Sequence, residues 1–422
     1  MISQSVLAVI IFLLVMICII TEKVNRAIVA MVGGLLMIIF NIITIETSIS
    51  HIDFNTIGVL IGMMMFVSVV KNSGLFEYIA IKSAKLAKGD PLKIMLAFIV
   101  ITAVLSAILD NVTTVLLIGP MTIVITQILN INPTPFLITQ ILASNIGGTS
   151  TLIGDPPNIM IGSAAGLSFS DFVVNLGPIV LIILIVTSII FKLIYGKNLT
   201  VDGKYKKEIM ELDEYKSIKD INLLKKSLVM MVFILLGFML HNVINMESSI
   251  VALTGASIMM IIGKQDVDEI LAEIEWSTIV FFIGLFVIVG GLVEVGIIET
   301  LANDLIYATQ GNQILTMILI LWLSAIVSSF LDNIPFVATL IPLLLTMQGQ
   351  GIDVEPLWWA TSLGACLGGN GSLIGASANI VLSNVGKKNG YPITFKEYIK
   401  IGFPLMLLSI VISTIYLLIR YS

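Results

Sequence analysis

The second half of the chain repeats the pattern of the first, and this duplication constrains the fold more than any other feature. The residues that recur at a spacing of 221 or 222 are Thr56 and Thr278, Gly62 and Gly284, Gly74 and Gly296, Asp110-Asn111 and Asp332-Asn333, and Asn158 and Asn379. Each copy interrupts its apolar runs at the same places. Paired interruptions in a duplicated membrane half are typical of secondary transporters, and they point to the binding site.

The composition indicates a protein that lies in a membrane. Hydrophobic residues make up 57% of the 422 residues and charged residues only 12%, whereas a soluble domain carries about 25% charge. The mean hydropathy is +1.07, and apolar stretches of about 20 residues recur along the whole chain. We therefore expect an all-α polytopic membrane protein. Two cysteines offer neither a disulfide framework nor a metal-binding spacing.

The pattern divides the chain into two repeats, 1–195 and 222–422, joined by a polar linker at 196–221. Each repeat is expected to hold five transmembrane helices, one of them broken, and a helical hairpin. The hairpins are predicted at 93–129 and 312–347, the broken helices at 135–165 and 355–385, and an early unbroken helix at 27–44. Since the linker is too short to bury a core, we interpret it as a connector.

The charges predict how the chain crosses the membrane. Five spans in each half would invert the second repeat relative to the first. If the loop at 22–26 lies in the cytoplasm, of the 22 Lys and Arg residues only Arg420 falls outside, in agreement with the positive-inside rule. Both termini are then outside and the linker is cytoplasmic, in a bacterial-type plasma membrane. We expect re-entrant hairpins because their arms are short; fully spanning arms would satisfy the charges equally well.

Polar residues gather where the first repeat is interrupted. Asp110, Asn111, Thr113 and Thr114 lie at the predicted hairpin turn. A run from Asn145 to Asn158 then contains Gly147-Gly148 and Gly154-Asp155-Pro156-Pro157, which cannot continue a helix. We expect unwound backbone there, with Asp155 capping a half-helix that starts at Pro156. Free carbonyls of such a break can bind a cation.

The second repeat carries fewer acids at its breaks. Asp332 matches Asp110, but Ala376 stands where the first repeat has Asp155, and no Lys or Arg occurs in any interruption. Three unpaired carboxylates would cost roughly 8–10 kcal/mol in the membrane, so a bound cation or proton is expected to neutralise them. Alternatively, the acids act only as helix caps, and the hydroxyls bond back to their own helices.

The candidate ion- or substrate-binding residues therefore come from both repeats. They are Asp110, Asn111, Thr113, Thr114, Asn145, Gly148, Thr149, Ser150, Asp155, Asn158, Asp332, Asn333, Asn370, Ser372 and Asn379.

The run from Asn145 to Asn158, together with the upstream Asp110-Asn111-Val-Thr-Thr, resembles the Ion Transporter superfamily. The likeness is greatest to the ArsB/NhaD permease type, including P-protein-like members, and more distant to sodium–dicarboxylate symporters. The resemblance implies two inverted repeats, an elevator mechanism and a homodimer. By the same resemblance, the Na⁺ ligands would be Asp110, Asn111, Asn145 and Asp155.

These observations predict a secondary active transporter, with sodium–proton antiport as the first choice and Na⁺ or H⁺ as the coupling ion. The alternative is proton- or sodium-coupled transport of an oxyanion or neutral oxyacid, such as arsenite or silicic acid efflux through Asn370 and Asn379. Dicarboxylate symport is less favoured, since no Arg clamp is visible. A passive channel would need no coupling. We expect no enzyme, and no nucleic-acid partner; an aspartyl protease would need a Gly before Gly154-Asp155 where Leu152 stands.

Overall fold

The protein is helical throughout the part of the chain that the structure describes. The computed structural model describes residues 3–21, 23–197 and 199–421, which form α-helices and two short 3-10 helices. Glu22, in the first predicted cytoplasmic loop, lies outside the described residues. Within these ranges, eight helices are long and apolar enough to cross a membrane. The predicted all-α polytopic membrane fold is thus confirmed in its class.

The eight long apolar helices are α1 (Gln4–Thr21), α4 (Phe54–Lys71), α6 (Pro91–Ile108), α7 (Asn111–Ile128), α10 (Phe169–Tyr195), α12 (Ile221–Leu240), α15 (Trp276–Glu294) and α21 (Phe395–Tyr421). Shorter apolar helices are α2 (Arg26–Ile39), α13 (Ser248–Gly263) and α18 (Asn333–Gly349), and α16 (Ile297–Thr309) meets α17 (Gln313–Ser328) at a bend of 120°. The remaining helices are α3 (Ile45–Ser50), α5 (Leu75–Leu86), α8 (Thr134–Gly148), α9 (Pro156–Ala165), α11 (Gly203–Glu211), η1 (Glu214–Ser217), α14 (Val267–Ala272), α19 (Glu355–Gly368), η2 (Gly369–Gly371) and α20 (Ser377–Lys388).

The prediction of one helix over 27–44 is wrong, because the chain turns after Ile39. Asn41 adopts a positive φ of 53°, a conformation that a right-handed helix cannot contain. Thr44 then accepts a hydrogen bond from the Thr47 amide and begins the separate helix α3. The second predicted helix is therefore shorter than the sequence pattern indicates.

Two crossed helix pairs hold the halves together. Helix α2 packs along α15, and α4 packs along α13, so each pair combines one helix from each half. The repeated glycines lie at these crossings. A Cβ atom on Gly62 would lie 2.6 Å from the Ala252 carbonyl carbon, and one on Gly284 would lie 2.5 Å from that of Ala30. Small residues at membrane helix crossings let backbones approach closely, which explains why both copies carry glycine here.

We expect Gly284→Val to destabilise the protein strongly. The added side chain would meet the α2 backbone at Ala30, which cannot move aside as a flexible side chain could. Overpacking of this kind costs about 1–3 kcal/mol or more. Gly177→Val is the matched control, since a Cβ there meets only a Val173 methyl at 3.8 Å. Thermal unfolding in detergent should show a large loss for Gly284→Val alone; equal losses would contradict the explanation.

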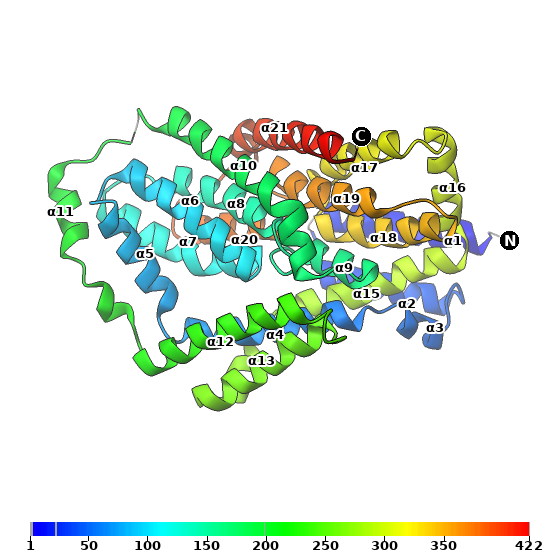
Figure 1. Cartoon of the computed structure of the whole chain (residues 1–422), viewed down its shortest axis with the longest axis horizontal. Helices are drawn as coiled ribbons and strands as arrows, with labels where there is room; N and C mark the ends of the chain where they lie inside the picture. Colours follow the sequence, from blue (N-terminus) through cyan, green and yellow to red (C-terminus); the bar gives the residue numbers. More distant parts are fainter. Residues whose placement is uncertain (1–2, 22, 198, 422) are drawn as a thin grey trace.

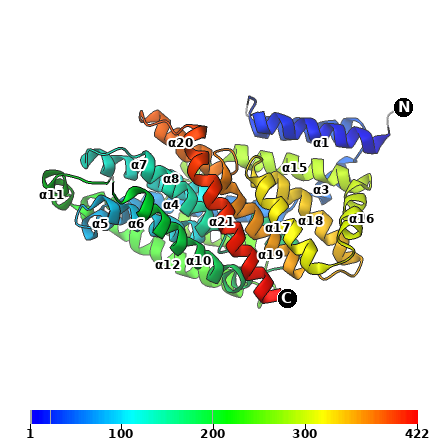
Figure 2. The ribbon, with the colours of Figure 1, turned by 90° about the horizontal axis from the view of Figure 1, so that it is seen from above.

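Two ends of the molecule can be distinguished (Figure 1). Helices α5 to α8 lie at the end that α11 occupies, and α16 to α18 lie toward the opposite end. Two short helices pack across this division: α9 contacts α18, and α20 contacts α7. In the view from above, α21 crosses the molecule beside α10 and α19 (Figure 2), in agreement with their contacts. The broken helices are therefore surrounded by other helices in the middle of the fold.

The linker docks on α5. Lys85 of α5 pairs with Glu214 and donates to the Leu212 carbonyl, and Lys219 lies 3.6 Å from Glu77. The Lys219 amide also donates to the Ser73 carbonyl at 3.0 Å. The Ser73 and Glu77 contacts lie at the N-terminus of α5, where Gly74 has a φ of +82°, and the Lys85 contacts lie in its last turn. The linker is thus a bound connector and does not form a domain of its own.

Removing the Lys85 side chain should loosen this docking. The hydrogen bond from Lys85 lowers the pKa of Glu214, so the pair stays charged at neutral pH and is lost as pH falls through that lowered pKa. Because the pair is solvated, its effect on global stability is small. We expect Lys85→Ala to speed tryptic cleavage within 203–219 at pH 7, with Lys93→Ala as the control. Unchanged cleavage would show that other contacts hold the linker.

Candidate functional site

Both broken helices open near the middle of the fold. Helix α8 ends at Gly148 and α9 begins at Pro156, so residues 149–155 are unwound. The prediction that Gly147-Gly148 breaks the helix is corrected, since both glycines are helical. They are required by packing: a Cβ on Gly147 would lie 2.1 Å from the Ala103 carbonyl oxygen of α6, and one on Gly148 would lie 2.4 Å from that of Gly154. The helix ends where its neighbours approach too closely for a side chain.

Two asparagines hold the unwound segments in place. The Asn158 amide nitrogen donates to the Thr151 carbonyl at 2.9 Å and to that of Thr149 at 3.2 Å. Asn379 does the same in the second repeat, to the Gly369 and Ser372 carbonyls at 2.7 and 2.8 Å. Several carbonyls that the sequence suggested as cation ligands are therefore already hydrogen-bonded. The repeated asparagines support the breaks, which explains their place in both copies.

A buried amide cluster joins the two breaks. Asn145 donates to the side-chain oxygens of Asn370 and Asn379, both at 2.9 Å, and accepts from Asn111 at 3.1 Å. Asn158 accepts from the Ser362 hydroxyl at 2.6 Å. These contacts bring together residues more than 200 positions apart. Asn111, Asn145, Asn370 and Asn379 thus form one hydrogen-bonded cluster that draws on both repeats.

The hydroxyls of the predicted candidates have four different environments. Thr113 donates to Asp110, whereas Thr149 and Ser150 bond back to carbonyls of α8. Thr114 has a buried hydroxyl without a partner among the described residues. Ser372 donates to the Ser329 carbonyl. The alternative of back-bonded hydroxyls therefore applies to Thr149 and Ser150.

Two of the three predicted acids cap helices. Asp110 is 8% exposed and accepts from the Thr113 amide at 2.7 Å and from its hydroxyl at 2.5 Å, at the start of α7. Asp332 is 6% exposed and accepts from the Ile334 amide at 3.1 Å, at the start of α18. Both hairpin turns are thus N-terminal helix caps, whatever else the carboxylates bind.

Asp155 differs, because its carboxylate caps nothing. It occupies the position before α9, but the next two residues are Pro156 and Pro157, which have no amide hydrogen to donate. The Asn158 amide is bonded to the Asp155 backbone carbonyl at 2.9 Å. The carboxylate is 1% exposed and accepts from the Asn333 amide group at 3.3 and 3.4 Å and from the buried Cys366 thiol. The capping role predicted for Asp155 is therefore wrong, and its oxygens stay available to a ligand.

A small cavity lies beside this carboxylate. Its volume is about 20 Å³, which is enough for one water molecule or one bare ion. The side chains around it that carry oxygen or nitrogen are Arg26, Asp110, Asn111, Asp155, Glu275, Thr278, Asn333 and Ser377. The turns of both hairpins and the helix starts after both breaks therefore meet at one ion-sized space.

Two charged residues at this cavity were missed from the sequence. Arg26 forms an ion pair with Asp332 at 2.8 Å, so the expectation of three acids without a basic partner is wrong. Glu275 also lines the cavity. The repeat could have revealed Glu275, because it matches Asp53 at the 222-residue offset, and each precedes the repeated threonine by three. No comparable signal identified Arg26, which lies 306 residues from Asp332.

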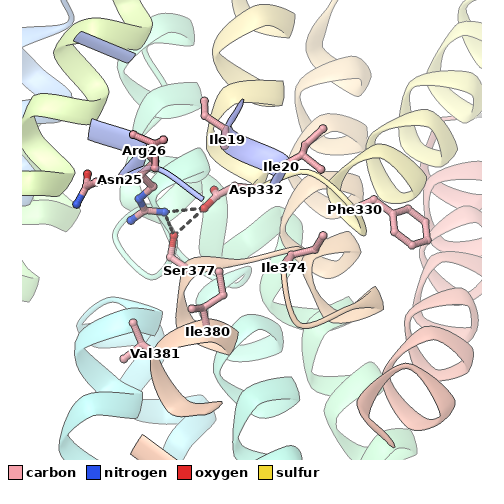
Figure 3. A pocket seen from close by; sticks show the side chains of 11 residues that line it. Ile19, Ile20, Asn25, Arg26, Phe330, Asp332, Ile374, Ser377, Ile380 and Val381 are labelled. Atoms are coloured by element: carbon pink, nitrogen blue, oxygen red, sulfur yellow. Dashed lines mark hydrogen bonds and ion pairs between the residues drawn. The ribbon is translucent and has the colours of Figure 1, made fainter. Parts of the chain in front are cut away.

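A larger cavity of about 230 Å³ lies on the other side of the ion pair, with a mostly apolar lining. Figure 3 shows the Arg26 guanidinium joined to both Asp332 and Ser377, among side chains that include Ile19, Phe330 and Ile380. Arg26 and Ser377 line both cavities. The ion pair therefore separates the small site from a wider opening.

The fold is similar to that of a solved transporter. The crystal structure of the YdaH transporter of Alcanivorax borkumensis matches with a TM-score of 0.59 at 13% sequence identity, over 98% of this chain and 97% of that one. Together with the paired helix breaks, the fold defines a multi-pass integral membrane protein with interrupted helices in its middle.

The chain belongs to the CitMHS family of citrate transporters, whose family model matches residues 16–364. It is 42% identical to an uncharacterised transporter of Mycobacterium tuberculosis over 99% of both chains, and 40% identical to a 46 kDa membrane protein of Mycobacterium leprae over 99% of both chains. It is also 32% identical to the human P protein, covering 96% of this chain and 58% of that protein. The predicted P-protein likeness is confirmed, while the ArsB/NhaD assignment stays a prediction. Membership in a family of transporters agrees with the expectation that the chain is not an enzyme.

Proposed function

We propose that this transporter exchanges Na⁺ for protons, with Asp155 as the carboxylate that binds either ion. The observation that carries the proposal is a buried, uncapped carboxylate beside a cavity of about 20 Å³. Carboxylate, amide and hydroxyl oxygens suit a hard cation. Because the space holds one ion, Na⁺ and a proton on Asp155 would exclude each other. Mutually exclusive occupancy of one site is what couples exchange.

The charges at the cavity favour a cationic ligand. Asp110, Asp155 and Glu275 are acidic, whereas the only basic side chain lining the cavity among the described residues is Arg26. Arg26 is already paired with Asp332. An ionised carboxylate in the membrane costs about 2.5–3.5 kcal/mol, so Asp110 and Asp155 require neutralisation by a cation or by protonation. In this proposal Asn111 supplies a further ligand, since its buried side-chain oxygen has no partner.

Citrate transport is the second candidate, because the family model carries that description. The geometry supports it less. A citrate trianion needs several donors, but Arg26 is paired and Asn145 and Asn379 donate within the protein. The same loss of free donors weakens the oxyacid alternative that relied on Asn370 and Asn379. The wider cavity beside the ion pair is mostly apolar, which also disfavours a polyanion.

We further propose that the halves are inverted repeats working as an elevator, in a homodimer. The mirrored contacts of α2 with α15 and of α4 with α13 support the repeats, as do those of α9 with α18 and of α20 with α7. The gathering of α5 to α8 at one end and α16 to α18 at the other supports re-entrant hairpins entering from opposite sides (Figure 1). The proposed orientation keeps both termini outside and residues 196–221 in the cytoplasm.

The test is ion exchange by the purified full chain in proteoliposomes that contain a pH-sensitive dye. An imposed outward Na⁺ gradient should drive proton uptake, and Li⁺ and K⁺ test cation selectivity. Labelled citrate and arsenite uptake are measured in the same vesicles. Citrate accumulation without Na⁺-driven proton flux would overturn the proposal and favour the family description.

A further inference from the structure

Arg26 is held by an extended set of contacts. It is the first residue of α2, and its guanidinium donates to the Asp332 carboxylate at 2.8 Å, to the Ser377 hydroxyl, and to the Thr278 hydroxyl at 3.5 Å. Its carbon Cζ lies 5.1 Å from the centre of the Phe281 ring, close enough for a cation–π interaction. Three elements, α15, α18 and α20, thus place side chains around one positive charge. An incidental surface ion pair does not have so many partners.

The repeats are unequal at this position. The residue 222 positions after Arg26 is Ser248, which begins α13 as Arg26 begins α2. Asp110, the counterpart of Asp332, makes no ion pair within the described residues, and neither does Asp155. At the hairpin turns and helix breaks, the first repeat therefore has two acids without a basic partner, and the second has one acid, Asp332, which is paired with Arg26.

Both oxygens of Asp332 also accept hydrogen bonds. One accepts from the Ile334 amide, and the other accepts from both Arg26 and the Ser377 hydroxyl, the latter at 2.7 Å. Asp155, in contrast, has the two long contacts with Asn333 and a weak thiol donor in Cys366, and no cationic partner among the described residues. A mobile ion that approached Asp332 would have to displace the guanidinium, whereas Asp155 requires no displacement.

We propose that Arg26 is a tethered counter-cation that occupies the ion site of the second repeat, so that the mobile ion is confined to Asp110 and Asp155. The inference rests on the proposed cation exchange. It makes Arg26 a positioning residue that determines how many ions each protomer carries. In place of two equivalent sites related by the repeat, the protein has one exchangeable site and one that is neutralised from within.

The first experiment counts bound ions. Equilibrium binding of ²²Na⁺ to the purified full chain is compared among wild type, Arg26→Gln, Arg26→Lys and Arg26→Gln/Asp332→Asn. Removing the guanidinium leaves Asp332 free to bind an ion, so Arg26→Gln should bind one more Na⁺ per protomer than wild type. Arg26→Lys should bind as many Na⁺ ions as wild type, because lysine supplies the positive charge beside Asp332. The double variant should also keep the wild-type number, because Asp332→Asn removes the charge that a cation must neutralise.

Asp332→Asn alone should keep the wild-type Na⁺ count. Loss of Na⁺ binding in Asp332→Asn, with no gain in Arg26→Gln, would overturn the inference, since Asp332 would then be a direct ligand. A merely structural role for Arg26 predicts destabilisation without any change in count. The double variant and Arg26→Lys keep the comparison usable if Arg26→Gln folds poorly.

The second experiment does not depend on which ion is transported. Thermal unfolding of the same four proteins and Asp332→Asn forms a double-mutant cycle. Leaving a buried acid unpaired is more damaging than removing both partners, so the double variant should melt higher than Arg26→Gln. Additive changes in melting temperature would show that Arg26 and Asp332 do not stabilise each other. If wild type binds no Na⁺ while the cycle shows coupling, the sodium proposal fails and the internal ion pair stands.

Discussion

Asp155→Asn should reduce Na⁺-driven proton flux in proteoliposomes by about 100-fold or more. The substitution keeps the side chain's size but removes both its charge and its titration. A charged hydrogen-bonding contact contributes about 1.5–3 kcal/mol, and each 1.4 kcal/mol is a factor of ten in affinity. Since an asparagine also cannot release a proton, exchange should be lost even at saturating Na⁺. Folding should be kept, because the Asp155 side chain caps no helix.

The control for this variant is Asp353→Asn, which neutralises an exposed acid that accepts from Gln313. It should exchange ions as wild type does. Flux is measured with the Na⁺ gradient imposed in each direction, so that a different orientation of the protein in the vesicles is not mistaken for a loss of exchange. Intact exchange by Asp155→Asn would remove Asp155 from the mechanism, and the two remaining cavity acids, Asp110 and Glu275, would have to supply the exchangeable site.

Asn158→Leu should be the most destabilising change at the breaks. Leucine has a similar size but cannot donate to the Thr149 and Thr151 carbonyls or accept from Ser362. Hydrogen bonds between membrane helices average about 0.6 kcal/mol and reach about 1.7. The carbonyls of the unwound segment, however, have no amide of a following helical turn as an alternative donor. We therefore expect a loss of about 2–4 kcal/mol and a clearly lower melting temperature in detergent.

Asn175→Leu provides the comparison within the same fold. Asn175 is also buried, but its side chain donates a single bond, to the Asp171 carbonyl one turn earlier. Its replacement should cost no more than about 1 kcal/mol. If the two variants melt at the same temperature, Asn158 contributes no more to stability than any buried amide. The recurrence of Asn158 and Asn379 would then need another explanation.

Much of the fold could be predicted because its signals are local or repeat along the chain. Gly74 and Gly296 both adopt positive φ at the start of α5 and α16, a conformation that favours glycine. The dipeptide Pro156-Pro157 had to begin a new helix. Two predictions failed for local reasons. The prolines that begin α9 have no amide hydrogen for Asp155 to accept. The turn at Asn41 divides the helix predicted over 27–44.

The amide cluster shows the limit of such reasoning. Each asparagine was identified from its own motif, yet nothing in the spacing showed that Asn145 would donate to both Asn370 and Asn379. Partners 225 and 234 residues away are selected by how the two broken helices cross. The same holds for the support that Asn158 receives from Ser362.

By itself, the order of residues determined a duplicated, membrane-embedded helical chain with polar gaps at matched positions, since hydropathy and helix-breaking chemistry act within a few neighbouring residues. Only the tertiary structure decided which charges meet. Arg26 neutralises Asp332 and leaves Asp155 beside an ion-sized space, because the packing of α2 against α15 carries a residue from the start of the chain to a hairpin tip near its end.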